Sequence, residues 1–236
     1  MYLGIDEAGK GPALGPMVAA AVIADPASLP ADVDDSKRIA PARREELAAA
    51  LRDDPDVAVG VARVEPAEID RPDTDMNTLT VRGQARAVRA AFAERPEGIA
   101  DPIRVVADAG DTSEERFAER LARFVSEEGD RECSEAARPL PSVDVTAAHG
   151  ADEDDPVVGA ASVVAKVVRD DAMAEIGAAY PAYDDLGSGY PSDPATRAFL
   201  AAYVGDHGTL PACARASWAT CEDALAAAEQ SALDEF

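Results

Sequence analysis

The segment that limits the possible folds and functions of this chain most strongly is residues 3–12, Leu-Gly-Ile-Asp-Glu-Ala-Gly-Lys-Gly-Pro. A short apolar run ends in two adjacent carboxylates, Asp6 and Glu7, and a lysine between two glycines follows at once. Adjacent carboxylates repel each other, and a divalent cation stabilises their ionised forms best. Gly9 and Gly11 have no Cβ, so backbone N–H groups there can converge on a phosphate or a sugar hydroxyl. The segment therefore suggests a metal site and a phosphate-binding loop together.

The apolar periodicity predicts strands that give way to alternating helices and strands. The expected strands are 2–5, 17–23, 57–64, 103–107 and 143–145, and the expected helices are 41–51, 77–92, 114–125 and 157–179, with two more helical stretches after 194. Thr112 or Ser113 is the expected cap of the helix at 114. The acidic segment 126–156 is interpreted as surface loop. This order predicts an α/β fold in three layers, with a central sheet flanked by helices.

The domain organisation expected from this pattern is one catalytic domain, residues 1–180, followed by a small helical C-terminal subdomain, residues 181–236. In sheets covered by helices on both faces, functional sites gather at strand ends. Asp6, Glu7 and Asp108 all lie at such ends, and Asp170 follows on a later helix. If the four carboxylates meet, they are tolerable only around bound cations, and two Mg²⁺ ions there would serve phosphodiester hydrolysis.

The composition is strongly acidic. The 236 residues include 46 Asp and Glu against 22 Lys and Arg, a net charge of −24, and only three of the basic residues are lysine. The acids are spread along the whole chain, a balance typical of proteins from salt-accumulating archaea, although GC-rich coding can produce the same arginine bias. Such a shell stays soluble in concentrated salt and repels itself in dilute buffer. We expect the protein to unfold at low salt.

The remaining composition indicates an ordinary intracellular protein. Cys133, Cys213 and Cys221 form neither a paired framework nor zinc-ligand spacing with His149 and His207, neither of which we expect to be a metal ligand. The longest apolar run is too short to span a bilayer, and no basic region precedes the N-terminal apolar stretch. These features predict a soluble cytoplasmic protein, with a monomer as the default.

Six segments together resemble ribonuclease HII, the type 2 ribonuclease H, in its archaeal form. They are GIDEAGKGP at 4–12, DDSKR at 34–38, VADAGDT at 106–112, AASVVAKVVRDD at 160–171, GSGYPSDP at 187–194 and RASWAT at 215–220. The resemblance implies a ribonuclease H-like fold. It also implies an endonuclease that hydrolyses the RNA strand of RNA/DNA hybrids and cuts at ribonucleotides embedded in duplex DNA, by two-metal-ion catalysis that leaves 3′-OH and 5′-phosphate ends.

The resemblance also assigns residues. Asp6, Glu7, Asp108 and Asp170 match the family's catalytic, metal-binding acids, which use Mg²⁺ or Mn²⁺. The substrate-binding residues that it implies are Gly9, Lys10 and Gly11 for the ribose 2′-OH and neighbouring phosphates, Tyr190 for a sugar, and Lys37, Ser162 and Lys166 for the phosphate backbone. The 2′-OH distinguishes RNA from DNA at a single position, and reading it requires a close backbone approach. Ala216 departs from the pattern, because a basic residue is usual there.

The C-terminus carries a second, smaller signal. Gln230, Leu233 and Phe236 are similar to the sliding-clamp-binding peptide of many archaeal replication and repair proteins. Side chains at this spacing can anchor one helical turn in a groove. A frayed amphipathic helix end is an equally good interpretation, and both remain open.

Two other functions remain open from the residues alone. The spacing of Gly4, Gly9 and Lys10 nearly matches the P-loop motif. However, the residue after the lysine is glycine, and two prolines disfavour the required helix, so the sequence argues against a nucleotide hydrolase. The third possibility is a non-catalytic acidic interaction module. Trp218 is interpreted as a packing residue.

Overall fold

The computed structural model describes residues 1–30, 32–33, 39–95, 98–132 and 140–234. The chain forms two compact units, each assembled from three separate segments. The first unit comprises residues 1–8, 18–63 and 76–168, and the second comprises residues 9–17, 64–75 and 169–236. The predicted subdomain, 181–236, lies within the second unit, and its limits as a domain stay a prediction. Lys37 lies outside the described residues.

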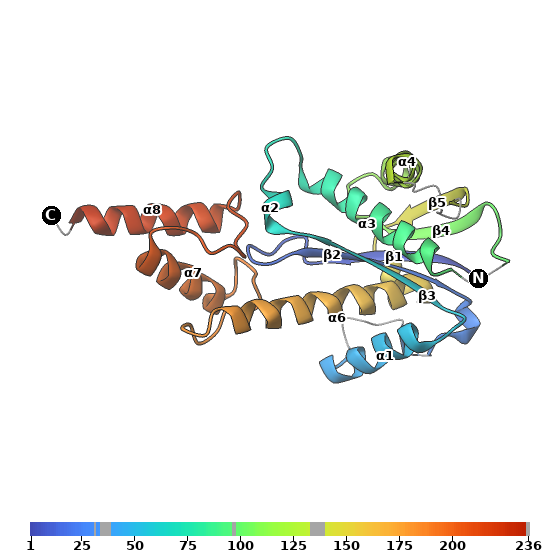
Figure 1. Ribbon diagram of the computed structural model, residues 1–236, viewed down its shortest axis with the longest axis horizontal. Helices are drawn as coiled ribbons and strands as arrows, with labels where there is room; N and C mark the ends of the chain where they lie inside the picture. The colour runs from blue at the N-terminus through green and yellow to red at the C-terminus, as the bar shows by residue number, and fades with distance from the viewer. Residues whose placement is uncertain (31, 34–38, 96–97, 133–139, 235–236) are drawn as a thin grey trace. The chain divides into compact units, whose positions relative to one another are not determined.

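A five-stranded mixed sheet is the centre of the fold (Figure 1). Its strands are β1 (Tyr2–Ala8), β2 (Met17–Ala24), β3 (Ala58–Val64), β4 (Ile103–Asp108) and β5 (Val143–Ala148), in the order β3-β2-β1-β4-β5. The central strand β1 runs antiparallel to β2 and parallel to β4, and β4 runs parallel to β5. Because β1 and β4 are parallel, their carboxyl ends, which carry the predicted acids, lie at the same edge.

The helices confirm the predicted alternation. They are α1 (Pro41–Asp53), α2 (Pro66–Ile69), α3 (Met76–Ala93), α4 (Glu114–Glu132), α5 (Ala151–Asp154), α6 (Pro156–Ala179), α7 (Pro194–His207) and α8 (Ala219–Asp234), with a short 3-10 turn at Pro26–Ser28. The helix α4 begins as expected, because the Ser113 hydroxyl accepts a hydrogen bond from the Arg116 N–H at 3.4 Å. Ser113, rather than Thr112, is therefore the cap.

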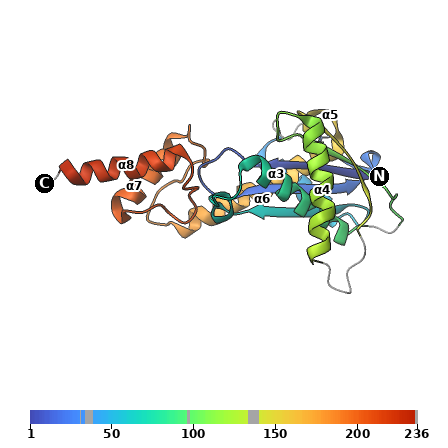
Figure 2. The same ribbon diagram turned by 90° about the horizontal axis from the view of Figure 1, so that it is seen from above.

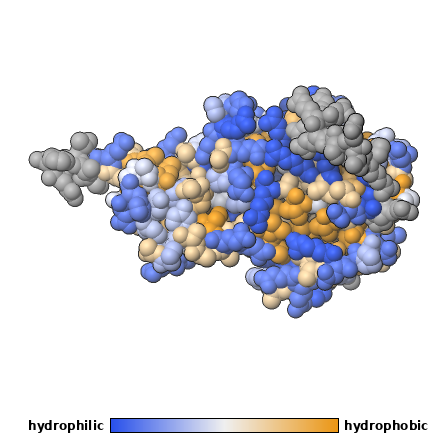
Figure 3. Space-filling model, viewed as in Figure 1, coloured by the Kyte–Doolittle hydropathy of each residue, from blue (hydrophilic) through white to orange (hydrophobic). Residues whose placement is uncertain are grey.

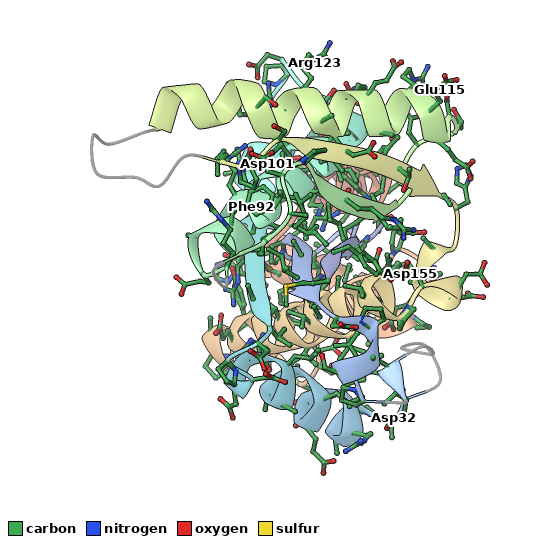
Figure 4. The ribbon with its side chains drawn as sticks, turned by 90° about the vertical axis from the view of Figure 1, so that its right-hand side faces the viewer. Asp32, Phe92, Asp101, Glu115, Arg123 and Asp155 are labelled. Atoms are coloured by element: carbon green, nitrogen blue, oxygen red, sulfur yellow. The ribbon has the colours of Figure 1, made fainter. Side chains whose placement is uncertain are left out.

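Helices cover both faces of the sheet in the first unit, which confirms the three layers (Figures 1 and 2). The helices α3 and α4 pack on one face, in a core that includes Leu3, Ile5, Phe92, Phe117 and Leu121. The helix α1 and residues 156–168 of α6 pack on the other face, in a core that includes Val22, Leu47, Leu51, Val157 and Val164. Glu115 and Arg123, which are exposed, lie on the outer side of α4 (Figure 4).

A glycine sets the distance between β1 and α6. A Cβ on Gly4 would lie 2.4 Å from the carbonyl carbon of Val157 and 2.5 Å from the nitrogen of Val158. No side chain fits in that space, so the helix backbone packs directly on the strand. The start of α6 is fixed further by Tyr2, whose hydroxyl lies 2.9 Å from both carboxylate oxygens of Asp155. Asp6, two residues after Gly4, therefore faces the same helix.

The prediction of a loop at 126–156 was wrong in three places. The helix α4 continues to Glu132, the strand β5 extends to Ala148, and the short helix α5 follows it. The apolar stripe of α4 ends at Val125, so the periodicity gave no sign of the last turns.

The second unit has its own core around the helices α7 and α8. Its aromatic rings meet edge to face or tilted, with Tyr180 and Phe199 centroids 5.4 Å apart. Asp193 caps α7 by accepting a hydrogen bond from the Ala195 N–H at 2.9 Å. Cys213 and Cys221 are buried free thiols in this core. Among the described residues, no helix has the length and apolar character needed to cross a membrane.

Candidate active site

The adjacent acids of β1 point to opposite faces of the sheet, because side chains alternate along a strand. Asp6 faces α6 and accepts a hydrogen bond from the hydroxyl of Ser162. Glu7 faces α3, where its Oε2 accepts a hydrogen bond of 2.7 Å from Nε2 of Gln84. The sheet edge between α3 and α6 therefore carries a carboxylate on each face.

Asp6 is the buried member of this group, with 6% of its surface exposed. Burial raises the pKa of Asp6 well above its usual value, and the negative charges of Glu7 and Asp108 raise it further. The Ser162 hydroxyl and the N–H of Glu7, which donates to Asp6 Oδ1 at 2.7 Å, act in the opposite direction. Burial and two neighbouring carboxylates thus disfavour the charge of Asp6 in the protein alone.

Gln84 joins the ends of β1 and β4. Its Nε2 donates to the Glu7 carboxylate and also lies 3.3 Å from the main-chain oxygen of Asp108. Gln84 is fully buried, and its Oε1 has no hydrogen-bond partner among the described residues. The side chain of Asp108 is held separately, since its Oδ1 accepts a hydrogen bond of 2.9 Å from the N–H of Ala151 at the start of α5. Both contacts fix the carboxylates relative to the sheet edge.

His149 holds the loops next to this edge. Its Nδ1 lies 2.8 Å from Oε1 of Glu114, and its Nε2 lies 2.8 Å from the main-chain oxygen of Asp111. The Asp111 carbonyl is the main cause that raises the pKa of His149, and the Glu114 carboxylate adds to it. The ring ties the start of α4 to the segments after β4 and β5.

In the second unit, the structure brings together three of the motifs found in the sequence. The carbonyl of Gly189 accepts hydrogen bonds from the N–H groups of Ala13 at 2.7 Å and Leu14 at 3.2 Å. Leu14 also pairs with Ala214 in an isolated β-bridge. The segments 9–15, 187–194 and 213–218 therefore form one cluster of loops, and the expected substrate-binding glycines belong to it.

Tyr190 lies beside Gly11 within this cluster. A Cβ on Gly11 would be 3.6 Å from Cε1 of the tyrosine, which is 47% exposed. Gly9 has a φ of 82°, and a Cβ there would be 2.5 Å from Nε of Arg169. Only glycine fits at position 9, both for its backbone angle and for the space available.

For the other predicted site residues the structure gives their position on a helix and their exposure. Lys166 is exposed on α6, four residues after Ser162, and Asp170 is exposed one turn further along the helix, in the second unit. Gln230 is exposed on α8. Phe236 and the side chain of Leu233 lie outside the described residues.

The carboxylates at the sheet edge fit a divalent cation by their chemistry. A cation beside Asp6 would reverse the repulsion that Glu7 and Asp108 impose on its charge. Within the described residues, no three Asp, Glu, His or Cys side chains are grouped so as to hold a metal ion by themselves. Mg²⁺ is usually bound by one or two carboxylates together with water and substrate phosphates, so a complete protein cage is not required.

Comparison with known proteins decides the family. A family model described as ribonuclease HII matches residues 3–221. The chain belongs to the ribonuclease HII family. Ribonuclease HII of the halophilic archaeon Haloarcula marismortui is 53% identical over 236 residues, covering 100% of both chains. As a member of this family, the chain is an endonuclease of the ribonuclease H class, which acts on the RNA strand of RNA/DNA hybrids.

Solved structures support the same family. The ribonuclease H2 of Pyrococcus horikoshii has a TM-score of 0.77 and 29% identity, covering 97% of this chain and 98% of the other. A PCNA:RNase HII complex from Archaeoglobus fulgidus has a TM-score of 0.74 and 32% identity, with 100% of both chains covered. Bst-RNase HIII in complex with Mn²⁺, with a TM-score of 0.74, 22% identity and coverage of 97% and 70%, supports the fold alone.

Three buried polar residues near the predicted site residues were missed in the sequence. Gln84 stands four residues after Thr80 on the buried, mostly apolar face of α3. An amide side chain among the apolar residues of this face was the signal that the sequence offered. Arg169 and Arg215 stand inside two of the motifs and are 4% and 0% exposed. Sequence alone does not separate a buried arginine from a solvated one, because both occur beside charged and apolar neighbours.

Proposed function

We propose that the chain hydrolyses the RNA strand of RNA/DNA hybrids and also cuts at single ribonucleotides in duplex DNA, by two-metal-ion catalysis at Asp6, Glu7, Asp108 and Asp170. The observation that carries this proposal is the buried Asp6, flanked by Glu7 and Asp108 at the common edge of β1 and β4. The fourth acid, Asp170, is included in the proposed site because it matches a metal-binding acid in the family's motif. Together these acids would hold Mg²⁺ or Mn²⁺.

The chemistry follows from this donor set. When bound, two such ions activate the attacking water and stabilise the leaving oxygen in an in-line displacement at phosphorus. The water oxygen forms the new bond to phosphorus and the P–O3′ bond breaks, which leaves 3′-OH and 5′-phosphate ends. Gln84 keeps the Glu7 carboxylate in place through its 2.7 Å hydrogen bond, and Ser162 does the same for Asp6.

In this proposal the loop cluster of the second unit supplies the contacts with the ribonucleotide. Gly9, Lys10 and Gly11 would contact the ribose 2′-OH and the adjacent phosphates, and the exposed ring of Tyr190 beside Gly11 would pack on a sugar. Lys166, exposed on α6, and Lys37 would contact the phosphate backbone. Phosphate contacts weaken steeply with salt, so metal bridging and shape would dominate binding in concentrated KCl.

The fold decides against one alternative. A P-loop requires a helix directly after the loop, whose N-terminus binds the phosphates. Here β1 is followed along the chain by the antiparallel strand β2, with no helix between them. A nucleotide hydrolase built on residues 4–10 is therefore excluded.

The proposal is tested with labelled duplexes in molar KCl containing Mg²⁺ or Mn²⁺. We expect a single nick in a DNA duplex that contains one ribonucleotide, degradation of the RNA in an RNA/DNA hybrid, and no cleavage of the all-DNA duplex of the same sequence. EDTA should abolish both reactions. Absence of a nick at the ribonucleotide, with hybrid cleavage intact, would limit the activity to hybrids. Absence of both with either metal would refute the proposal.

We also propose that the C-terminal tail binds the sliding clamp. The support is the spacing of Gln230, Leu233 and Phe236, together with the similarity to an RNase HII found in complex with PCNA. The helix α8 carries the tail, and its Gln230 is exposed.

Deleting residues 233–236 should weaken binding to the clamp of the same organism at least tenfold, about 1.4 kcal/mol, because two of the three anchors are lost. Calorimetry in molar KCl measures the affinity. The control is Glu229→Gln, which changes one exposed charge on α8 and keeps the anchors. Equal affinity of the deletion variant and the full chain would contradict the clamp proposal.

A further inference from the structure

The carbonyl groups of the loop that follows β1 are bound by side chains from a distant part of the chain. Arg215, which is fully buried, donates from Nη2 to the oxygen of Gly9 at 2.6 Å and from Nη1 to the oxygen of Lys10 at 2.9 Å. Its Nε donates to the oxygen of Gly15 at 2.9 Å. Trp218 donates from Nε1 to the oxygen of Gly11 at 3.0 Å. All these residues belong to the second unit.

These bonds fix the direction of the N–H groups as well. In a planar trans peptide, the C=O of one residue and the N–H of the next point in opposite directions. Holding the oxygens of Gly9 and Lys10 against Arg215 therefore turns the N–H groups of Lys10 and Gly11 away from it. Successive N–H groups with this orientation form a concavity that suits an anion or a hydroxyl. The guanidinium group thus determines which side of the loop presents donors.

The surroundings of Arg215 hold it firmly. Its guanidinium carbon lies 5.0 Å from the centroid of the Trp218 ring. The next two residues are fixed by Asp70, whose carboxylate accepts from the N–H of Ala216 at 2.8 Å and from the N–H of Ser217 at 2.9 Å. The backbone next to Arg215 is therefore fixed, and the side chain of Arg215 in turn fixes the loop carbonyls to which it donates.

Arg169 fills the space beneath the same loop. Its Nη2 donates to the oxygen of Leu14 at 2.7 Å, and its Nη1 lies 3.1 Å from the position of a Cβ on Gly15. Burial, together with the charge of Arg169, lowers the pKa of Arg215 to about 10. Two neighbouring buried cations are costly for folding. Between them they donate hydrogen bonds to the main-chain oxygens of Gly9, Lys10, Leu14 and Gly15.

We propose that Arg215, assisted by Trp218, is a positioning residue that sets the preference for a ribonucleotide by orienting the N–H groups of Lys10 and Gly11. Arg215 itself contacts no substrate atom. The inference rests on the proposed function, in which these residues contact the 2′-OH and its phosphate. A residue that only stabilised the fold would affect all substrates equally, whereas a positioning residue affects the distinction between ribose and deoxyribose.

The test is Arg215→Lys. Lysine keeps the positive charge, but one ammonium group cannot reach three carbonyls arranged around a planar fork. Binding is measured at equilibrium without turnover, in the Asp6→Asn background with Ca²⁺, for a duplex with one ribonucleotide and for the same duplex in all-DNA form. We expect the ratio of the two dissociation constants to fall about tenfold in the Arg215→Lys variant, through weaker binding of the ribonucleotide duplex. Affinity for the all-DNA duplex should change less than about twofold, because its contacts do not need the 2′-OH.

A milder variant guards against misfolding. Trp218→Phe keeps a ring over Arg215 and removes only the hydrogen bond to Gly11, so the ratio should fall about threefold. The control is Arg71→Lys in the same unit, which alters an exposed ion pair with Asp73 and should leave the ratio unchanged.

Circular dichroism and melting curves establish that each variant is folded. A folded Arg215→Lys protein with the ratio of the parent, or with both affinities reduced equally, would show a purely structural role and overturn the proposal. If Arg215→Lys does not fold, an unchanged ratio in Trp218→Phe overturns it instead. If the Asp6→Asn protein with Arg215 intact binds both duplexes equally, the proposed recognition of the ribonucleotide is wrong. The positioning role is then wrong as well, and this outcome differs from the others because the preference is absent before Arg215 is changed.

Discussion

Replacing Asp6 with asparagine is expected to lower the rate of hybrid cleavage by at least about 10³-fold, or roughly 4 kcal/mol of transition-state stabilisation. Asparagine keeps the size of the side chain and an oxygen that can accept from Ser162 and from the N–H of Glu7. It removes the charge that would bind the metal ions. Single-turnover rates in molar KCl with Mg²⁺ or Mn²⁺ measure the loss.

The same substitution has an opposite effect on stability. Burial and the charges of Glu7 and Asp108 oppose the ionised form of Asp6 in the protein without metal. A neutral amide removes that unfavourable charge, so the metal-free variant should melt at the same temperature as the parent or higher. A loss of activity with retained stability separates a missing catalytic group from a damaged fold.

The matched control is Asp144→Asn. Asp144 also lies on a strand of the sheet, but it is exposed in β5, away from the strand end that carries Asp108. Its substitution should leave the cleavage rate within about twofold of the parent, as expected for a surface change far from the site. If Asp6→Asn cleaves at the rate of the parent and of Asp144→Asn, the proposed catalytic centre is wrong.

The sheet and the long helices were predictable because their periodicity is strong. The strand at residues 17–23 is apolar at every position, and β2 is buried throughout its length. The 157–179 pattern gave α6 to within one residue. Elements without an apolar stripe were missed. The short helix α5 depends on a contact that only the folded chain supplies, the hydrogen bond from the N–H of Ala151 to Asp108.

The residues of the candidate site also fall into a group that the sequence predicted and a group that it did not. Asp6, Glu7 and Asp108 were found because carboxylates at the ends of predicted strands indicate a functional site from the sequence pattern alone. Gln84, Arg169 and Arg215 act through main-chain atoms or through another side chain, and such partners are set by tertiary packing. Arg215 and Gly9 are more than two hundred positions apart, and neither periodicity nor spacing relates them.

The charge of the chain leads to the second large effect, which concerns stability in dilute buffer. A net charge of −24 is spread along the sequence, and hydrophilic residues are spread over the visible surfaces of both units (Figure 3). The Debye length is about 10 Å at 0.1 M salt and about 3 Å at 1 M, so lowering the salt lets many more carboxylates repel one another. The exposed ion pairs, such as Arg43 with Asp32, contribute too little to offset this repulsion.

We therefore expect the melting temperature to fall by roughly 10 °C or more between 2 M KCl and dilute buffer, which corresponds to about 3–5 kcal/mol for a chain of this size. Calorimetry measures the fall. A control variant with the exposed residues Glu119, Asp184 and Glu229 changed to their amides carries three fewer negative charges. Its melting temperature should fall less steeply, since self-repulsion grows with net charge. Equal melting temperatures at both salt concentrations would contradict the prediction that repulsion between the acidic residues destabilises the fold in dilute buffer.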